Sequence, residues 1–554
     1  MQELAKYMND IEIPLFKERG GKRTRQYRFF EMLPAILSIS AIALLIIFSI
    51  FAPLAASILV LFVVIMMFVR AITIAGRVVH GRITINKTQQ INWAKWLSEL
   101  EDPAKFAEIH AKDINSRKFG LRQHVLNLQQ LSGMESEFPK PSEILNVVII
   151  PFYNESYEVW EPTLKKLKAS DYDIKNKLIV VVAYEQRGGQ AALDTVAEIK
   201  KNWQGIFKEL FFVEHPADLP DEVIGKGGNI TYAGKFIKNW VEEQGIDPEY
   251  VIVTTQDCDN QPHKKYFSYL TYEWIVTPNR QRVAFQPVCL FMDNIWDVPA
   301  PVRVVATGNS FWNMISTMRP HQLRNFAAHS QGLAPLIGMN FWSTRTIVED
   351  GHQYWRSYFY FKGDYSVVPL RIGYGQSAVS STGYGKTLKA QFVQLRRWAY
   401  GASDIPYVAK NLLRRDRKVG FFAGWSRFFR LVEGHFTLAC VAPIVAFGAW
   451  LPLFLNSTAA RQYILVNDLP LIVSRIQTVA VSGLLISMLI SLVMLPPRPK
   501  RYRKSKWIAM VLQWVLMPVT AIVYSSSCAY AAQTRLLTGR YLNKFDVSEK
   551  VIKK

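Results

Sequence analysis

Two short stretches of the chain carry carboxylates at spacings that could do chemistry. In TTQDCDN, Asp257 and Asp259 are two residues apart, so on an extended strand both side chains point to one face. Two such carboxylates repel each other unless a cation lies between them, and oxygen ligands suit Mg²⁺ or Mn²⁺, which also bind phosphate oxygens. In TRTIVEDGHQYW, Glu349 and Asp350 stand at the expected start of a helix. They are either helix caps or a general base, Asp350, that takes a proton from an acceptor hydroxyl.

A third stretch, QFVQLRRWAY, brings an amide, a guanidinium and an indole within about one and a half helical turns. These are Gln394, Arg397 and Trp398. Taken alone, the pattern is typical of a helix at a membrane surface. As the wall of a site, the arginine would offer a planar fork to phosphate and the indole a flat surface to a sugar ring.

The elements that must position these residues are strands and helices in alternation. Four strand-like apolar runs, ILNVVIIPF, KLIVVVAYE, KELFFVEH and EYVIVTT, are separated by helical patterns. Such runs predict buried strands of a mostly parallel α/β sheet, whose ligands bind at the carboxyl ends of the strands. Further candidate residues follow those strand ends or lie in a glycine-containing loop that leads into a helix. They are Pro151, Asn154, Glu155, Glu185, Lys226 and Asn229.

Apolar residues and positive charge are unevenly spread along the 554 residues. Half of the residues are hydrophobic and the formal net charge is +22. Basic clusters at 17–28, 410–420 and 498–506 each adjoin an apolar stretch, which is the positive-inside pattern of cytoplasmic loops. We therefore expect membrane lipids as partners and no nucleic acid, which would favour basic residues gathered on one soluble face.

Apolar stretches long enough for membrane helices lie on both sides of the predicted sheet. Two N-terminal spans would place the sheet on the side of the N-terminus, but three clean C-terminal spans would place the basic tail on the other side, against the positive-inside rule. The expected division is a basic cytoplasmic N-terminus (1–30), two transmembrane helices (31–75), a polar linker with amphipathic helices (76–143), the α/β domain (144–405), a basic interfacial helix region (406–433), three transmembrane or re-entrant segments (434–533) and a basic tail (534–554).

The cysteines do not indicate a structural role. Cys258, Cys289, Cys440 and Cys528 are scattered, with no C-x-x-C pair and no Cys/His cluster at zinc spacing, which predicts free thiols in a reducing compartment. The first 30 residues contain no apolar core, so we expect no cleavable signal peptide.

Together the ordered motifs resemble the membrane-embedded family 2 glycosyltransferases, the group of cellulose and hyaluronan synthases. The resemblance is carried by P-x-x-N-E at 151–155, D-C-D at 257–259, E-D at 349–350 and Q-L-R-R-W at 394–398, between apolar stretches. It implies a GT-A-type domain between N- and C-terminal transmembrane helices, a nucleotide-sugar donor and inversion at the anomeric carbon.

The resemblance also implies roles for individual residues. Asp257 and Asp259 would hold the diphosphate and an Mg²⁺ or Mn²⁺ ion, with Asp259 favoured as the direct ligand, and Asp350 would be the general base. Arg397 would meet the diphosphate and Trp398 the acceptor sugar. The remaining donor-side residues would be Pro151, Asn154, Glu155, Glu185, Lys226 and Asn229, and the remaining acceptor-side residues Glu349 and Gln394.

The chain departs from the family pattern in two places. Glu185 stands where the second strand usually ends in Asp. The segment QGLAPLIGMNFWSTRTIVED lacks the Gly-rich, Arg-Arg pattern that is common before the base, which leaves the identity of the donor sugar open. The tail of about 20 residues after the last apolar stretch has no room for a regulatory domain of the cyclic-dinucleotide type.

These features predict an integral protein of a bacterial-type inner membrane, with its catalytic domain in the cytoplasm. The expected reaction is hexose transfer from a nucleotide-sugar, with a UDP-sugar favoured, to a growing polysaccharide, either processively with translocation or not. One alternative is transfer of a single sugar to a lipid acceptor. The other is a non-catalytic membrane protein that binds phosphorylated sugars or anionic lipid.

Overall fold

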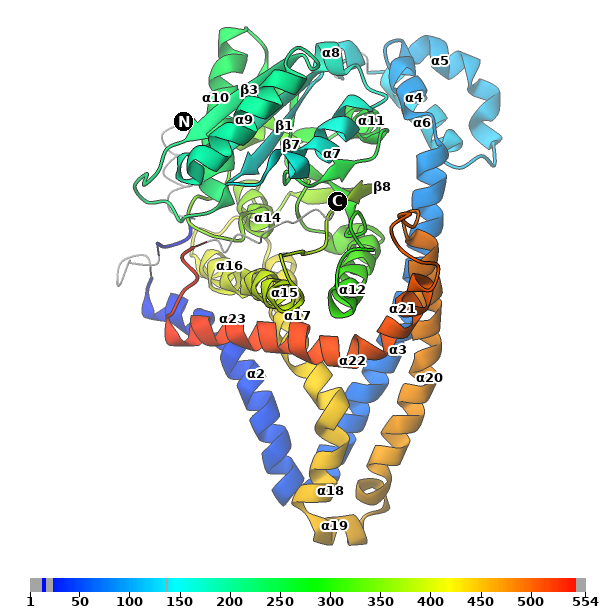
Figure 1. Ribbon diagram of the computed structural model, residues 1–554, viewed down its shortest axis with the longest axis vertical. Coiled ribbons are helices and arrows are strands. Elements are labelled where there is room, and N and C mark those ends of the chain that lie inside the picture. Colours follow the sequence, from blue (N-terminus) through cyan, green and yellow to red (C-terminus); the bar gives the residue numbers. More distant parts are fainter. Residues whose placement is uncertain (1–11, 16–22, 135–137, 545–554) are drawn as a thin grey trace.

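The computed structural model describes residues 12–15, 23–134 and 138–544. Parts of the predicted basic N-terminus and tail, namely 1–11, 16–22 and 545–554, lie outside the described residues. A sheet with helices on both faces forms one end of the molecule, and long helices extend from it to the other end (Figure 1).

The four runs form strands β1 to β4. These strands belong to an eight-stranded sheet with the order β3-β2-β1-β4-β7-β6-β8-β5. The sheet is mixed rather than mostly parallel. β3, β2, β1 and β4 are parallel, as are β6 and β8, whereas β7 is antiparallel to both of its neighbours and β5 is antiparallel to β8. The strands are β1 Leu145–Phe152, β2 Leu178–Glu185, β3 Glu209–His215, β4 Val251–Thr255, β5 Gln261–Pro262, β6 Val283–Leu290, β7 Ser330–Gly332 and β8 Ser366–Gly375.

Alternating side chains of the parallel strands divide between two hydrophobic cores, as the twofold strand period requires. Val147 and Ile149 of β1 face the core shared with α10 and α14, and Val148 and Ile150 face the core shared with α7, α9 and α11. Burial on both faces explains why the runs that form β1, β2 and β4 are largely apolar. The helices of this domain are α7 Tyr157–Lys168, α8 Ile174–Lys177, α9 Gly189–Trp203, α10 Lys226–Glu243, α11 Tyr266–Val276, α12 Ala300–Thr317, α13 Leu333–Gly338, α14 Glu349–Tyr360, α15 Tyr384–Ala399 and α16 Asp404–Leu413.

Long helices precede and follow the sheet in the chain. Helices α2 and α3 come before the sheet and are followed by a small helical segment formed by α4, α5 and α6. Helices α17 and α20 come after the sheet and run lengthwise beside α2 and α3 (Figure 1). Short helices α18 and α19 join α17 to α20 at the end remote from the sheet. Their bounds are α2 Arg25–Phe51, α3 Pro53–Gln90, α4 Trp93–Glu99, α5 Pro103–Ile109, α6 Leu121–Ser132, α17 Phe421–Phe447, α18 Leu451–Leu455, α19 Ser457–Gln462 and α20 Ile464–Met494.

Four helical stretches of the described residues are long and apolar enough to cross a membrane. They are Arg25–Phe51, Pro53–Gln90, Phe421–Leu455 and Lys506–Thr538. The last comprises α21 Lys506–Leu512, α22 Met517–Thr520 and α23 Ser527–Thr538 with the short turns between them, and it lies crosswise to the long helices, on the side of the sheet (Figure 1). The segment predicted at 406–433 does not form a separate interfacial helix after residue 420, because α17 continues without a break to Phe447.

The crosswise helix leads to the basic tail, whose first residues are held near the start of α2 and the sheet domain. The guanidinium of Arg28, at the start of α2, donates hydrogen bonds to the carbonyls of Leu536 and Leu537 at the end of α23. Further on, Lys544 forms a β-bridge with Ile224 of the sheet domain. The described part of the tail therefore lies on the side of the sheet.

Candidate active site

The centre of the candidate site is the ammonium group of Lys226 at the first residue of α10. Lys226 Nζ lies 3.1 Å from Asp257 Oδ1, 3.1 Å from Asp350 Oδ2 and 3.8 Å from Glu349 Oε1. Its side chain is only 8% exposed, so the charge is withdrawn from water and held by these carboxylates. Three predicted motifs that are far apart in the sequence therefore meet at one cation.

The secondary structure explains why these residues converge. Asp257 follows the carboxyl end of β4, and Glu349 and Asp350 form the first turn of α14, where the helix dipole favours negative charge. Gly227 lets α10 approach the loop before α14, because a Cβ atom there would lie 2.4 Å from the carbonyl oxygen of Ser343. The close neighbour of Gly227 in the structure is therefore the protein backbone.

Glu349 and Asp350 have different surroundings although they are adjacent in the chain. The Glu349 side chain is 4% exposed, and the Asp350 side chain is 20% exposed. Burial, with the nearby charge of Asp350, raises the pKa of Glu349 to about 8, although Lys226 and Arg397 oppose the shift. Its surroundings therefore favour the protonated form of Glu349, and the more accessible Asp350 is the better placed of the two to accept a proton from a substrate.

His329 is a further residue of the site that the sequence analysis missed. Its Nδ1 lies 3.8 Å from Asp350 Oδ1 and 2.8 Å from the carbonyl oxygen of Phe326, and its Nε2 lies 3.3 Å from the indole nitrogen of Trp342. Because an indole nitrogen can only donate, Nε2 is the acceptor and the ring proton is on Nδ1. Burial lowers the pKa of His329, which keeps the ring neutral beside Asp350.

A second pair of carboxylates involves Asp259, which is buried, and Asp293, which follows β6. Burial and the negative charge of Asp259 raise the pKa of Asp293 to about 8. A Cβ atom at Gly375 of β8 would lie 2.5 Å from Asp293 Oδ2, so the glycine leaves room for the carboxylate in its present position. The sequence analysis missed Asp293; its position after the apolar run VAFQPVCL was the available signal.

The carboxylates of this region are of the ligand type that Mg²⁺ and Mn²⁺ prefer. Asp259 and Asp293 are carboxyl groups close enough to influence each other inside the protein, and Asp257 adds a third carboxylate two residues from Asp259. A divalent cation would relieve this repulsion, and carboxylate oxygens are the ligands that both ions prefer. Asp257 and Asp259 are the residues predicted to hold the metal, and the structure adds Asp293 as a candidate.

The residues of the Q-x-x-R-W stretch lie on α15. The positive charge of Arg397 acts on Glu349, which places this helix at the side of the carboxylate cluster. The Trp398 ring is 38% exposed and lies 5.7 Å from the ring of Phe291, two residues before Asp293. Gln394 accepts a hydrogen bond from Gln391 one turn earlier, at 3.3 Å. An exposed indole beside the cluster offers a flat surface to a ring-shaped ligand.

Two predicted donor-binding residues make hydrogen bonds within the protein. Asn229 donates to the carbonyl of Ala183 in β2 at 2.9 Å and so joins α10 to the sheet. Glu185 Oε2 lies 3.2 Å from Nδ1 of His215, whose Nε2 lies 3.0 Å from Glu222 Oε2. Although burial disfavours the charged imidazole, these two carboxylates raise the pKa of His215 to about 9.

The residues of the P-x-x-N-E stretch follow the order of the strand and its loop. Pro151 is buried in β1, and Asn154 is exposed in the loop after it. Glu155 accepts hydrogen bonds from the backbone N–H groups of Tyr153 at 2.9 Å and Asn154 at 3.2 Å. The Glu155 carboxylate therefore shapes the loop that presents Asn154.

No protein-family model matches the chain, and no curated protein matches its sequence. Among solved structures, the mannosyltransferase PcManGT from Pyrobaculum calidifontis in complex with GDP-Man and Mn²⁺ is 15% identical, with a TM-score of 0.36 over 77% of this chain and 98% of its own. TarS from S. aureus is 11% identical, with a TM-score of 0.31 over 65% of this chain and 57% of its own. Its 1–349 fragment with UDP-GlcNAc is also 11% identical, with a TM-score of 0.32 over 72% and 93%. Similarities this remote assign neither an activity nor a substrate to this chain.

Proposed function

We propose that this protein is a membrane-embedded, inverting glycosyltransferase of the GT-A type that transfers a hexose from a nucleotide-sugar, with a UDP-sugar as the favoured donor. The observation that carries the proposal is the contact of Lys226 with both Asp257 and Asp350, at 3.1 Å each. It joins a candidate diphosphate-binding carboxylate to a candidate general base, beside the helix that carries Arg397 and Trp398.

In the proposed reaction, Asp350 accepts the proton of an acceptor hydroxyl while that oxygen attacks the anomeric carbon. The bond from the anomeric carbon to the nucleotide diphosphate breaks, and the diphosphate leaves with the bonding electrons. General-base catalysis of this kind contributes about 10²–10⁴-fold. Lys226 and Arg397 supply positive charge toward the leaving group, and electrostatic groups of this kind contribute about 10²–10³-fold each.

On the donor side, Asp257 and Asp259 would hold Mg²⁺ or Mn²⁺, and such an ion, when bound, neutralises charge on a diphosphate. Pro151, Asn154 and Glu155 are proposed to border the nucleotide at the end of β1. Since Glu185 and Asn229 make hydrogen bonds within the protein, we propose that they stabilise the elements of the donor site and do not contact the donor themselves.

On the acceptor side, Trp398 would stack on a sugar ring, and Gln394 and the neutral Glu349 would offer hydrogen bonds. In the first version of the proposed reaction, the acceptor is a growing polysaccharide, which is extended processively and passed between the long helices. In the second form of the reaction, a single sugar is transferred to a lipid acceptor. The crosswise position of α21–α23 favours this second form, because it leaves α2, α3, α17 and α20 as the lengthwise helices among the described residues, few for a translocation channel (Figure 1).

We place the four lengthwise helices in a bacterial-type inner membrane and the sheet domain in the cytoplasm, where nucleotide-sugars are available. The length and apolar character of α2, α3 and α17 support a membrane, and the basic clusters beside the helices support a cytoplasmic sheet. The crosswise helix would then lie at the membrane surface on the side of the sheet.

The test uses the full chain in lipid nanodiscs with Mg²⁺ or Mn²⁺ and a panel of UDP- and GDP-sugars. Nucleotide release and the size of the sugar-containing product are measured for the wild type, for Asp350→Asn and for the control Asp364→Asn. Asp364 is an exposed acid paired with Arg282, so its change should leave turnover unaltered. Long product would support a processive synthase, and one sugar on lipid would support single transfer. Equal turnover by Asp350→Asn and wild type would overturn the assignment of the base.

A further inference from the structure

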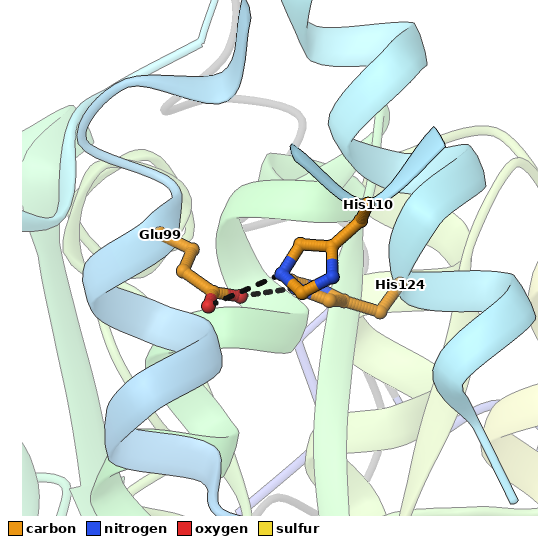
Figure 2. Close-up of side chains that lie close together, drawn as sticks. All are labelled: Glu99, His110 and His124. Atoms are coloured by element: carbon orange, nitrogen blue, oxygen red, sulfur yellow. Dashed lines mark hydrogen bonds and ion pairs between the residues drawn. The ribbon is translucent and has the colours of Figure 1, made fainter. Parts of the chain in front are cut away.

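Three potential metal ligands gather in the helical segment between α3 and the sheet. Glu99 ends α4, His110 follows α5 and His124 lies on α6. One ligand atom from each lies within 4.8 Å of the others, and all three side chains point toward one another (Figure 2). We propose that Glu99, His110 and His124 bind a zinc ion that stabilises this helical segment. The site is separate from the proposed transferase site and does not depend on it.

Both imidazoles are oriented as metal-binding histidines usually are. Nε2 of His124 lies 2.7 Å and Nε2 of His110 lies 3.4 Å from the Glu99 carboxylate (Figure 2). The opposite nitrogens have partners of their own, since Nδ1 of His110 lies 2.9 Å from Asp113 Oδ2 and Nδ1 of His124 lies 2.9 Å from the hydroxyl of Tyr272. A partner on the far nitrogen fixes the ring and directs the near nitrogen at the ion.

The ligand types favour zinc over the hard cations proposed for the other site. Imidazole suits zinc and other late transition metals, whereas Mg²⁺ and Ca²⁺ prefer oxygen ligands alone. Zinc binds histidine nitrogen and carboxylate oxygen at about 2.0–2.2 Å, so tetrahedral ligand atoms are roughly 3.4 Å apart. The present spacing needs only small side-chain shifts to reach that geometry, with a water molecule as the fourth ligand.

A purely proton-mediated cluster is the competing explanation, in which Glu99 simply pairs with protonated imidazoles. Glu99 and His124 are buried, at 2% and 1% exposure, so their charges must be compensated in either case. Lys95 acts on both forms of the cluster in the same direction. Its Nζ lies 3.7 Å from Glu99 Oε1, where its positive charge would repel a divalent ion and a protonated imidazole alike. The Lys95 side chain is 62% exposed and can move into water when the ion binds.

The cluster lies where the long helices join the sheet domain. Trp96 of α4 stacks on the ring of His124, with the ring centres 4.5 Å apart. Trp93 of α4 stacks on Tyr269 of α11 at 4.0 Å, and Tyr272 of α11 is the partner of His124. An ion held by Glu99, His110 and His124 would therefore fix α4, α6 and α11 to one another directly after α3, which is a structural role.

The test is zinc binding by the full chain in nanodiscs after chelator treatment, titrated with Zn²⁺ against a chromophoric chelator. We expect one equivalent bound tightly by the wild type and a raised Tm of the bound form. Affinity should fall more than 100-fold in His110→Ala and His124→Ala, and about 10- to 100-fold in Asp113→Asn, which removes only an orienting partner. Lys95→Gln should bind zinc more tightly, because it removes a positive charge close to the ion.

Two controls assign the bound equivalent to this cluster. His321→Ala changes an exposed histidine elsewhere, and Asp259→Asn changes the proposed transferase site; both should keep the equivalent. Co²⁺ in place of zinc should show the intense visible bands of a tetrahedral nitrogen-oxygen site in the wild type and in Asp259→Asn. If the wild type binds no zinc, or if folded His110→Ala, eluting as the wild type does in gel filtration, binds it equally well, the proposal is wrong.

Discussion

The ammonium nitrogen of Lys226 lies 3.1 Å from the nearer carboxylate oxygen of Asp350, although 124 positions separate the two residues. The contact joins the first residue of α10 to the first turn of α14. It holds the proposed base beside the charge proposed to act on the leaving group. The proposed reaction requires a base and an electrostatic stabiliser in one site. Substitutions at this contact therefore test the proposed reaction most directly.

Lys226→Met should impair both stability and catalysis, because it leaves Asp257, Glu349 and Asp350 without their shared cation. Breaking a buried ion pair costs roughly 3–5 kcal/mol, and we expect about 3 kcal/mol here since the Asp257 side chain is 40% exposed. Nucleotide release should fall about 10²- to 10³-fold. Chemical denaturation and turnover in nanodiscs measure the two effects.

The control for that change is Lys238→Met, on the exposed part of the same helix. Lys238 pairs only with the exposed Glu242 one turn away, at 3.5 Å, among the described contacts. Such surface pairs contribute at most about 1 kcal/mol, so this variant should resemble the wild type. If the two lysine variants behaved alike, Lys226 would have no special role.

Glu349 should make stability fall as the pH rises. Its pKa is about 8 in the folded chain and near 4.5 when unfolded, so between these values the folded state holds a proton that the unfolded state has lost. This contribution is complete below pH 4.5 and lost as the pH rises through 8. Glu349→Gln keeps the neutral, hydrogen-bonding form at every pH. Its Tm, followed by tryptophan fluorescence between pH 5 and 9, should decline less than that of the wild type.

Several elements of the structure follow from the sequence for clear physical reasons. Strands β1, β2 and β4 are predictable because they are buried on both faces and therefore rich in apolar, β-branched residues. Strand β3, at the edge of the sheet, is predictable from its short apolar centre. Strands β5 and β7 have two and three residues, too few to produce a periodic pattern, and these two strands introduce the antiparallel pairings that make the sheet mixed. The crosswise course of α21–α23 depends on tertiary contacts that its apolar composition does not reveal.

Some residues of the candidate sites are likewise predictable from the sequence and others are not. Asp257 and the Glu349–Asp350 pair stand at the ends of regular elements, and the carboxyl edge of a sheet is where ligands are expected. Asp293 and His329 lie in irregular segments as single residues without a spacing pattern. Glu99, His110 and His124 come from three elements at spacings unlike those of zinc motifs, so only the folded chain brings them together.

His215 should stabilise the fold at neutral pH and progressively less at alkaline pH. Its pKa of about 9 lies above the unfolded value near 6.5, so the stabilisation is complete below 6.5 and lost as the pH rises through 9. His215→Gln should therefore lower the Tm more at pH 6.5 than at pH 10. An equal loss at both values would mean that the ring acts through packing alone.

A substitution of Glu185 distinguishes a structural role of this residue from a role in binding the donor. Its carboxylate contacts His215 and Arg187, the latter at 2.8 Å. If Glu185 acts by supporting this network, Glu185→Gln should lower the Tm by several degrees and leave the KM for the nucleotide-sugar within about twofold. A KM raised tenfold with an unchanged Tm would instead place the carboxylate in direct contact with the nucleotide.

Trp398→Ala should weaken binding of the acceptor and leave binding of the nucleotide-sugar donor unchanged. The ring is 38% exposed and faces Phe291, so its removal leaves the Lys226 cluster intact while taking away a stacking surface worth about 1 kcal/mol or more. The KM for the acceptor should rise about five- to tenfold, with little change in the KM for the nucleotide-sugar. Trp312→Ala is the matched control, because that indole is 53% exposed on α12 and packs on Phe326. Equal effects of the two tryptophan variants on the acceptor, or a selective effect of Trp398→Ala on the donor, would remove Trp398 from the acceptor side of the site.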